Sequence, residues 1–298
     1  MSEDAWTIGR LLNWTTDFLK EKGVESPRLE AEVLLAHARG SQRIELYTAF
    51  EEPASDELRD KFRALVKDRA AGKPVAYLVG EKEFYSLPFY VTSDVLIPRP
   101  ETEEMVVRAL DLAKESNKQE LAIADVGTGS GILAICLAKH LPAATVTAID
   151  VSPKALEVAS RNAERHGVQE RIQFVESDLF SQIEPSTKFD LIVSNPPYVK
   201  SSELADLAVD VRDFEPTLAL DGGEQGTDVI TRLVEQSASR LNPGGWLLME
   251  IGPSTVEATE QLVAAKLDLT LQPTLTDAAN LPRIVQARYL SREGDTTS

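Results

Sequence analysis

Residues Leu121–Gly131 read LAIADVGTGSG, an apolar run that passes directly into a glycine-rich turn. The run predicts a buried strand over Leu121–Val126, and the glycines allow a tight turn into a helix at Ile132–His140. Strand and helix patterns then alternate, which predicts an α/β fold with a mostly parallel sheet covered on both faces. The further strands are expected at Thr145–Asp150, Ile172–Glu176, Phe189–Ser194 and Trp246–Ile251, with helices at Pro153–Gly167 and Gly226–Leu241.

The end of the chain departs from this alternation. After a helix predicted at Thr255–Lys266, two strand patterns follow without a helix between them, at Leu269–Leu275 and Arg283–Leu290. Two strands joined by a short connection pair in antiparallel fashion, so the last strand is expected to be antiparallel in the sheet. Residues 292–298 are expected to form a polar tail.

The first 80 residues have a helical pattern and predict a small bundle. Apolar residues recur at helical spacing from Ile8 to Leu19, and Ser26-Pro27 is typical of a helix start. A third helix is expected behind Ser55. The pattern changes to that of a short hairpin at residues 81–95. We therefore expect a helical substrate-docking domain at 1–80, a hairpin linker at 81–95 and the α/β domain at 96–291.

Composition narrows the class of protein. The formal charge of −17 disfavours a nucleic acid partner, because a polyanion is repelled unless a local basic groove overrides the field. Cys136 is the only cysteine and the three histidines are scattered, so no metal site is expected. Neither an export signal nor a membrane span is indicated, and a cytoplasmic location is expected.

Polar residues at three successive strand ends predict a nucleoside site. The glycine loop has the pattern G-x-G-x-G and follows Asp125, which suits a cationic group better than a phosphate. Asp150, at the end of the second strand, is placed to accept both hydroxyls of a ribose. Asp178 is placed to accept the amine of an adenine, with Leu179 and Phe180 offering apolar surface. This combination favours S-adenosylmethionine, with S-adenosylhomocysteine as product, over NAD.

The loop Asn195-Pro196-Pro197-Tyr198 directly follows the strand Phe189–Ser194. Its prolines cannot continue a sheet ladder, so the chain must leave the strand as a stiff loop. The Asn195 amide oxygen and the Pro196 carbonyl can then hold a planar NH2 group, and Tyr198 offers it a flat face. Holding an amide nitrogen in line with a methyl donor contributes roughly 7–11 kcal/mol, which outweighs any electronic activation.

These residues resemble a known family, the release factor glutamine methyltransferases (PrmC/HemK). The resemblance covers nearly the whole chain, and Gly72–Leu78 and Leu96–Glu103 are similar to signatures of that family. It implies a Rossmann-like class I methyltransferase sheet and methylation of the side-chain nitrogen, N5, of the glutamine in the Gly-Gly-Gln loop of class 1 peptide chain release factors. The implied catalytic residues are Asn195, Pro196, Pro197 and Tyr198, and the cofactor-binding residues are Gly127, Thr128, Gly129, Ser130, Gly131, Asp150, Asp178, Leu179 and Asn195.

Two alternatives remain open at this stage. A DNA or ribosomal RNA base amino-N-methyltransferase uses the same loop, and it predicts nucleic acid binding that weakens steeply with salt. An idle binding module predicts binding of cofactor or release factor without methyl transfer. The expected partner is a release factor, with no nucleic acid and no membrane, and the chain is expected to be a monomer.

Overall fold

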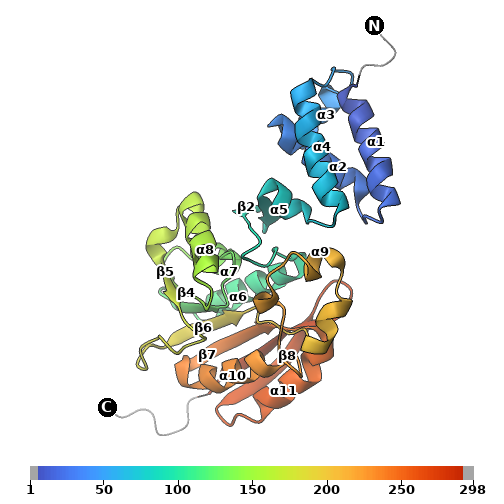
Figure 1. Cartoon of the computed structure of the whole chain (residues 1–298). Helices are drawn as coiled ribbons and strands as arrows, with labels where there is room; N and C mark the ends of the chain where they lie inside the picture. Colours follow the sequence, from blue (N-terminus) through green and yellow to red (C-terminus); the bar gives the residue numbers. More distant parts are fainter. Residues whose placement is uncertain (1–5, 291–298) are drawn as a thin grey trace. The chain divides into compact units, whose positions relative to one another are not determined.

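A computed structural model describes residues 6–290 of the chain (Figure 1). These residues divide into two compact units. The first comprises the chain up to Glu81 together with Ala208–Phe214, and the second comprises Lys82–Leu207 and the chain from Glu215 onward. The polar tail predicted at residues 292–298 lies outside the described residues.

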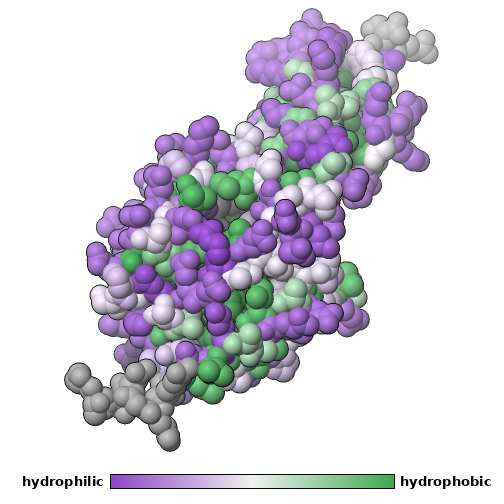
Figure 2. Space-filling view, turned by 60° about the horizontal axis from the view of Figure 1, so that its bottom comes forward, coloured by the Kyte–Doolittle hydropathy of each residue, from purple (hydrophilic) through white to green (hydrophobic). Residues whose placement is uncertain are grey.

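The side chains on the face drawn in Figure 2 are largely hydrophilic, with smaller apolar patches between them. Between residues 6 and 290, no helix has the length and apolar character needed to cross a bilayer.

The first unit is built from short helices. They are α1 (Ile8–Glu21), α2 (Pro27–Arg39), α3 (Arg43–Thr48), α4 (Asp56–Ala70) and α5 (Val75–Val79), with α9 (Val209–Arg212) from the later segment. The three helices predicted here are confirmed. Side chains of Thr7 and Ser55 accept hydrogen bonds from the backbone of the turns they open, and Gly40 ends α2 in the left-handed conformation.

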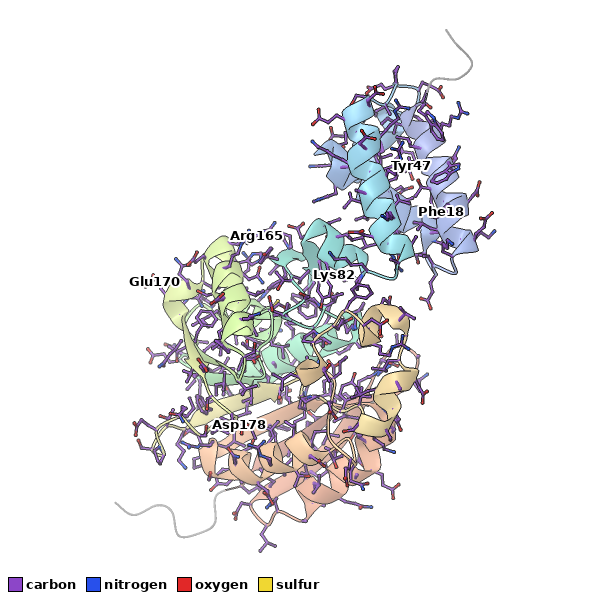
Figure 3. All side chains as sticks on the ribbon, in the orientation of Figure 1. Phe18, Tyr47, Lys82, Arg165, Glu170 and Asp178 are labelled. Carbon is purple, nitrogen blue, oxygen red and sulfur yellow. The ribbon has the colours of Figure 1, made fainter. Side chains whose placement is uncertain are left out.

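A buried carboxylate connects the helices of the first unit. Glu32 on α2 accepts hydrogen bonds from Arg28, Arg43 and Tyr47, of which Tyr47 is labelled in Figure 3. These donors hold the pKa of Glu32 below its ordinary value in spite of burial. The carboxylate therefore ties α2 to α3 through charge-assisted hydrogen bonds.

The second unit contains a seven-stranded sheet and confirms the predicted fold class. In sheet order the strands are β5 (Ile172–Glu176), β4 (Thr145–Asp150), β3 (Ala122–Val126), β6 (Phe189–Ser194), β7 (Leu241–Glu250), β9 (Pro282–Tyr289) and β8 (Leu269–Thr276). Neighbours from β5 to β7 are parallel, and β9 is antiparallel to both β7 and β8. The last strand is thus the antiparallel one, as predicted.

Helices cover both faces of this sheet (Figure 1). They are α6 (Glu103–Glu115), α7 (Ile132–His140), α8 (Pro153–His166), α10 (Asp228–Ser237) and α11 (Val256–Ala264). Successive strand residues point to opposite faces. Ile123 and Leu191 consequently pack with α6 and α7, whereas Ala124 and Ile192 pack with α10 and α11.

A hairpin of β1 (Glu81–Phe84) and β2 (Leu87–Tyr90) precedes the sheet. Its turn residues Tyr85 and Ser86 have φ of 50° and 57°, as a tight hairpin turn requires. Phe84 and Phe89 are fully buried in the core that contains α6 and α7. The hairpin is therefore packed into the second unit.

Candidate functional site

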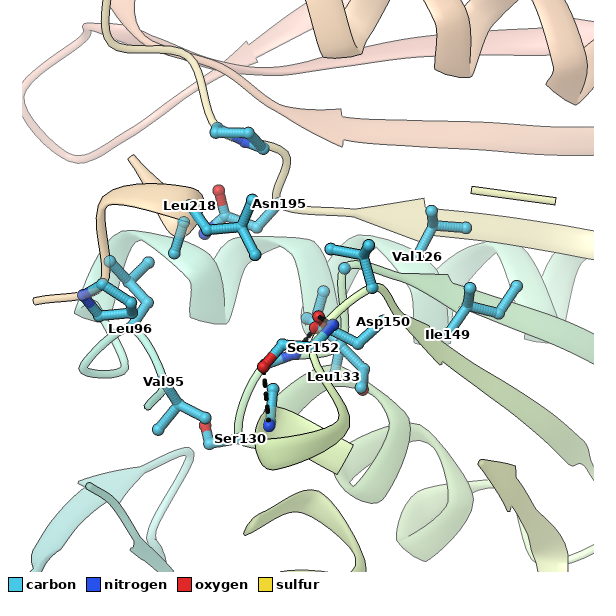
Figure 4. Close-up of a pocket in the computed structure, with 18 of the residues that line it drawn as sticks. Val95, Leu96, Val126, Ser130, Leu133, Ile149, Asp150, Ser152, Asn195 and Leu218 are labelled. Carbon is cyan, nitrogen blue, oxygen red and sulfur yellow. Dashed lines mark hydrogen bonds between the residues drawn. The ribbon is translucent and has the colours of Figure 1, made fainter. Parts of the chain in front are cut away.

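A cavity of about 380 Å³ opens at the carboxyl ends of β3, β4 and β6 (Figure 4). Parallel strands direct these ends to one edge of the sheet, where α/β proteins bind their ligands. The lining includes apolar side chains, among them Val95, Leu96, Leu133, Ile149 and Leu218. Polar side chains, among them Asp150, Asp178 and Asn195, lie between these apolar ones, and such a combination is typical of small-molecule sites.

The glycine loop forms one wall of the cavity. Gly127, Gly129 and Gly131 have φ of 75°, 54° and 83°, a region that side chains disfavour. Gly127, Thr128, Gly129 and Ser130 line the cavity, but Gly131 does not. A Cβ at Gly131 would lie 3.0 Å from Ile135 and 3.1 Å from the Cβ of Ala159, so this glycine allows α7 and α8 to approach each other.

Asp125 lies beneath the loop and is not one of the residues that line the cavity. The Thr128 hydroxyl and the Ala134 backbone N–H donate to its Oδ2, at 2.6 and 3.0 Å. Complete burial raises the pKa of Asp125 to about 7. Its role is therefore to hold the loop, in contrast to the direct contact with a cationic ligand that the sequence suggested.

Asp150 is bound to the glycine loop through one carboxylate oxygen and to the start of α8 through the other. Oδ2 accepts from the N–H of Gly129 and Oδ1 from the N–H of Ser152, each at 2.9 Å. Each oxygen keeps a second lone pair, and the residue lines the cavity. Burial raises the pKa of Asp150 above its ordinary value. The carboxylate can thus accept further hydrogen bonds from a ligand.

The loop after β5 brings Asp178 and Leu179 to the cavity. Asp178, labelled in Figure 3, forms an ion pair of 2.5 Å with Arg232, another lining residue. Leu179 has a φ of 50°, an uncommon and strained conformation for a leucine. Phe180 instead lies in the core against Phe189. Of the two apolar residues predicted to face an adenine, only Leu179 reaches the cavity.

The proline loop after β6 places Asn195 and Pro197 in the cavity wall, whereas Pro196 and Tyr198 are not among the lining residues. Tyr198 packs on Gly252, where a Cβ would come within 2.9 Å of its ring. Burial raises the pKa of Tyr198 to about 12. The phenol is therefore neutral, and the ring supports the loop from behind.

Two further glycines fit against the same loop. A Cβ at Gly222 would lie 2.8 Å from the Pro197 carbonyl oxygen, and one at Gly226 would lie 2.7 Å from that of Tyr198. The backbone N–H of Val199 donates to Leu220, and that of Gly222 donates to Val199. The loop is thus clamped by a segment that the sequence did not connect with it.

Two residues that support the site, Asn162 and Glu215, were not predicted from the sequence, because their partners are distant along the chain. Asn162 is fully buried, donates to the carbonyls of Tyr90 and Ser130, and accepts from the N–H of Tyr90. Glu215 is buried and accepts from Arg99 and from the backbone N–H of Ile97. The contacts of Asn162 thus connect the hairpin to the glycine loop, and those of Glu215 hold the segment Leu96–Glu103, which the resemblance had singled out without a structural role.

Family comparisons agree with this geometry. The chain matches the model of the PrmC N-terminal domain over residues 10–80 and that of the methyltransferase small domain over residues 104–211. In structure, the chain is similar to the hMettl16 catalytic domain, solved in complex with a 3′UTR hairpin. The TM-score is 0.54 at 16% identity, covering 78% of this chain and 84% of that one.

Curated relatives extend over almost the whole chain. The release factor glutamine methyltransferase of Rhodopirellula baltica is 49% identical over 263 residues, which is 88% of this chain and 89% of the relative. That of Geobacter sulfurreducens is 45% identical over 254 residues, which is 85% of this chain and 87% of the relative. With such identity across both units, the chain belongs to the release factor glutamine methyltransferase family.

Proposed function

We propose that this chain transfers a methyl group from S-adenosylmethionine to the side-chain amide nitrogen, N5, of the glutamine in the Gly-Gly-Gln loop of class 1 peptide chain release factors. One observation carries the proposal most directly. Asn195, with an amide that can hold another amide, lines the same cavity as the Gly129–Asp150 pair that suits a ribose. The expected sites of the methyl acceptor and of the methyl donor therefore lie in the same cavity.

The residues of the cavity fit the proposed cofactor. Its volume of about 380 Å³ falls in the range of small-molecule sites. A Cβ added at Gly129 would have no atom within 4 Å. This glycine therefore borders open space where a ligand can approach the backbone. Asp150 would hold the ribose and Leu179 the adenine face, with Gly127, Thr128, Ser130 and Gly131 shaping the loop.

Asp178 would bind the adenine amine only if its carboxylate serves two partners. Its ion pair with Arg232 occupies one oxygen, Oδ2. The other oxygen can still accept from an exocyclic amine. We place Asp178 at the adenine end on this basis.

The loop residues would act by positioning. S-adenosylmethionine supplies a methyl group on a positively charged sulfur. Asn195 Oδ1 would accept one N–H of the glutamine amide. The resemblance assigns the other N–H to the Pro196 carbonyl, although Pro196 is not among the residues that line the cavity. Pro197 would keep the loop stiff, and Tyr198 would support it through its packing on Gly252. Such orientation contributes roughly 7–11 kcal/mol. A new N–C bond replaces the S–C bond, the sulfur becomes neutral, and the nitrogen loses one proton to solvent.

The first unit offers a surface for the release factor. A groove of about 620 Å³ between α1 and α4 is lined by aromatic residues, including Trp14 and Phe18, whose rings stack at 5.2 Å. Within the described residues, its lining holds four basic side chains and no acidic one: Lys22, Arg59, Arg63 and Lys67. In a chain of charge −17, this groove suits an acidic segment with apolar side chains.

Incubation with labelled cofactor and a purified class 1 release factor tests the proposal. Mass mapping should locate one methyl group on the glutamine of the Gly-Gly-Gln loop. A label on nucleic acid would favour the base methyltransferase, and cofactor binding without any transfer would favour an idle module. A label on another residue of the release factor would refute the assigned substrate.

A further inference from the structure

Three side chains from separate segments, Thr102, Asn195 and Glu250, meet at the wall of the cavity, which Thr102 and Asn195 line and Glu250 does not. Thr102 ends a 3₁₀ turn, Pro100–Thr102, and is 0% exposed. Glu250 ends β7 and is 3% exposed. Ser194 pairs with Met249 in the parallel ladder of β6 and β7, so the next residues, Asn195 and Glu250, lie side by side at the ends of these strands.

The hydrogen bonds within this cluster have defined donors and acceptors. Asn195 Nδ2 donates to Thr102 Oγ1 at 3.4 Å. The side chains of Thr102 and Asn195 also hydrogen-bond to the Glu250 carboxyl and favour its ionised form. Both partners offered to the Asn195 nitrogen are therefore oxygen acceptors.

This polarity matters because the two ends of an asparagine amide have opposite character. The nitrogen donates two hydrogen bonds and the oxygen accepts two, and a 180° flip exchanges them. A flip of Asn195 would turn its oxygen toward the oxygens of Thr102 and Glu250 and leave buried groups unsatisfied. The cluster thus keeps the nitrogen toward Thr102 and Glu250 and the oxygen free.

A buried carboxyl group such as that of Glu250 is energetically unfavourable if it serves only a structural purpose. Its Oε2 is buried and has no hydrogen-bond partner among the described residues. Burial and the nearby charge of Glu101 together raise the pKa of Glu250 to about 7, against the opposing effect of Arg283, which is itself bound to Asp277. Isolated buried carboxyl groups are unfavourable and occur mostly where they serve a function.

We propose that Glu250 and Thr102 are positioning residues for Asn195, which engage its amide nitrogen and so present its oxygen Oδ1 to the N–H of the substrate amide. The inference rests on the proposed function for the role of Asn195. Glu250 acts from outside the lining of the cavity, through its neighbours.

The arrangement should respond to pH near neutrality. The charged and titratable groups that face Glu250 are Glu101, Arg283 and Tyr198, and Tyr198 stays neutral with a pKa of about 12. As the pH falls through about 7, Glu250 gains a proton and becomes a donor as well as an acceptor. The preference of the cluster for the Asn195 nitrogen is then lost.

Two pairs of variants of the full-length protein separate positioning from packing. Thr102→Ser keeps the hydroxyl and Glu250→Asp keeps the carboxylate, whereas Thr102→Val and Glu250→Met remove the acceptor at similar size. The acceptor-free variants should lower kcat for release factor methylation by about 10- to 100-fold, and the acceptor-keeping variants by at most about threefold. KM and the Kd for S-adenosylmethionine should stay within about twofold throughout. Equal kcat within each pair would overturn the proposal.

A measurement that does not use turnover separates this inference from the proposed function. In protein labelled with ¹⁵N-asparagine, the Asn195 side-chain signal is assigned from its loss in Asn195→Ala. It should shift as the pH crosses about 7 in the wild type and lose this titration in Glu250→Gln. A signal that does not titrate would refute the positioning role even if the enzyme methylates release factors. A titrating signal without methylation would refute only the proposed function.

Discussion

Replacing Asp150 with asparagine should damage cofactor binding far more than turnover. The carboxylate accepts from the N–H of Gly129 and of Ser152, each at 2.9 Å, and has lone pairs left for two ribose hydroxyls. An asparagine has only one acceptor oxygen, so its NH2 group must face a donor on one side. It also replaces charge-assisted hydrogen bonds with weaker neutral ones.

The expected loss follows from these contacts. A hydrogen bond to a charged group contributes about 1.5–3 kcal/mol and a neutral one about 0.5–1.5 kcal/mol. Two weakened ribose contacts therefore cost about 2–3 kcal/mol, which raises the Kd for S-adenosylmethionine by about 30- to 160-fold. Turnover at saturating cofactor should change by less than about threefold, because the reacting groups remain in place.

Isothermal titration calorimetry at pH 8 measures the affinity, and steady-state methylation measures the turnover. Asp111→Asn is a matched control, because Asp111 is an exposed carboxylate on α6 that pairs with Lys114. The control should bind cofactor like the wild type. An unchanged Kd in Asp150→Asn, or an equal loss of kcat at saturation, would refute the ribose assignment.

Four other expectations concern the loop, the core and the groove. Asn195→Ala should lower kcat by orders of magnitude with little change in cofactor Kd, and an equal loss in both would contradict its role. Asn162→Leu removes three buried hydrogen bonds and should lower the free energy of unfolding in urea by about 3 kcal/mol; a loss below about 1 kcal/mol would contradict this. In the folded state the pKa of Asp125 is raised from 3.8 to about 7, so its contribution to stability is present below pH 4 and is lost as the pH rises through 7. In Asp125→Asn, the free energy of unfolding should therefore decline less over this pH range than in the wild type. Trp14→Ala removes a half-exposed side chain from the groove (52% exposed) and should raise KM for the release factor while the cofactor Kd stays constant; an unchanged KM would argue against docking there.

Regular elements with strong patterns were predicted closely. The bounds of β4, β5, β6 and α7 agree with those predicted, since each is an uninterrupted apolar or helical pattern between clear turn residues. The six-residue α3 and the five-residue α5 were missed, because they are too short to show a helical period. The strand β7 begins at Leu241, five residues before the predicted Trp246, since the Asn-Pro-Gly-Gly stretch within it is typical of a turn.

The candidate site was predicted in part for a similar reason. Parallel strands bring their carboxyl ends to one edge, so Asp150 and Asn195 could be placed together from their positions after β4 and β6. The direction of each side chain was harder to predict. Asp125 turns beneath the glycine loop and Phe180 into the core, because the packing of the neighbouring helix and strand decides which face is free.

By itself, the sequence determined the order of strands and helices, the strand ends that carry polar residues, and the family, because these depend on local periodicity and motifs. Only the tertiary structure decided which distant groups support them. Thr102 meets Asn195 across 93 residues, and Glu250 joins them because β7 lies beside β6 in the sheet. Such contacts arise from the three-dimensional packing of segments whose sequences contain no local sign of their partners.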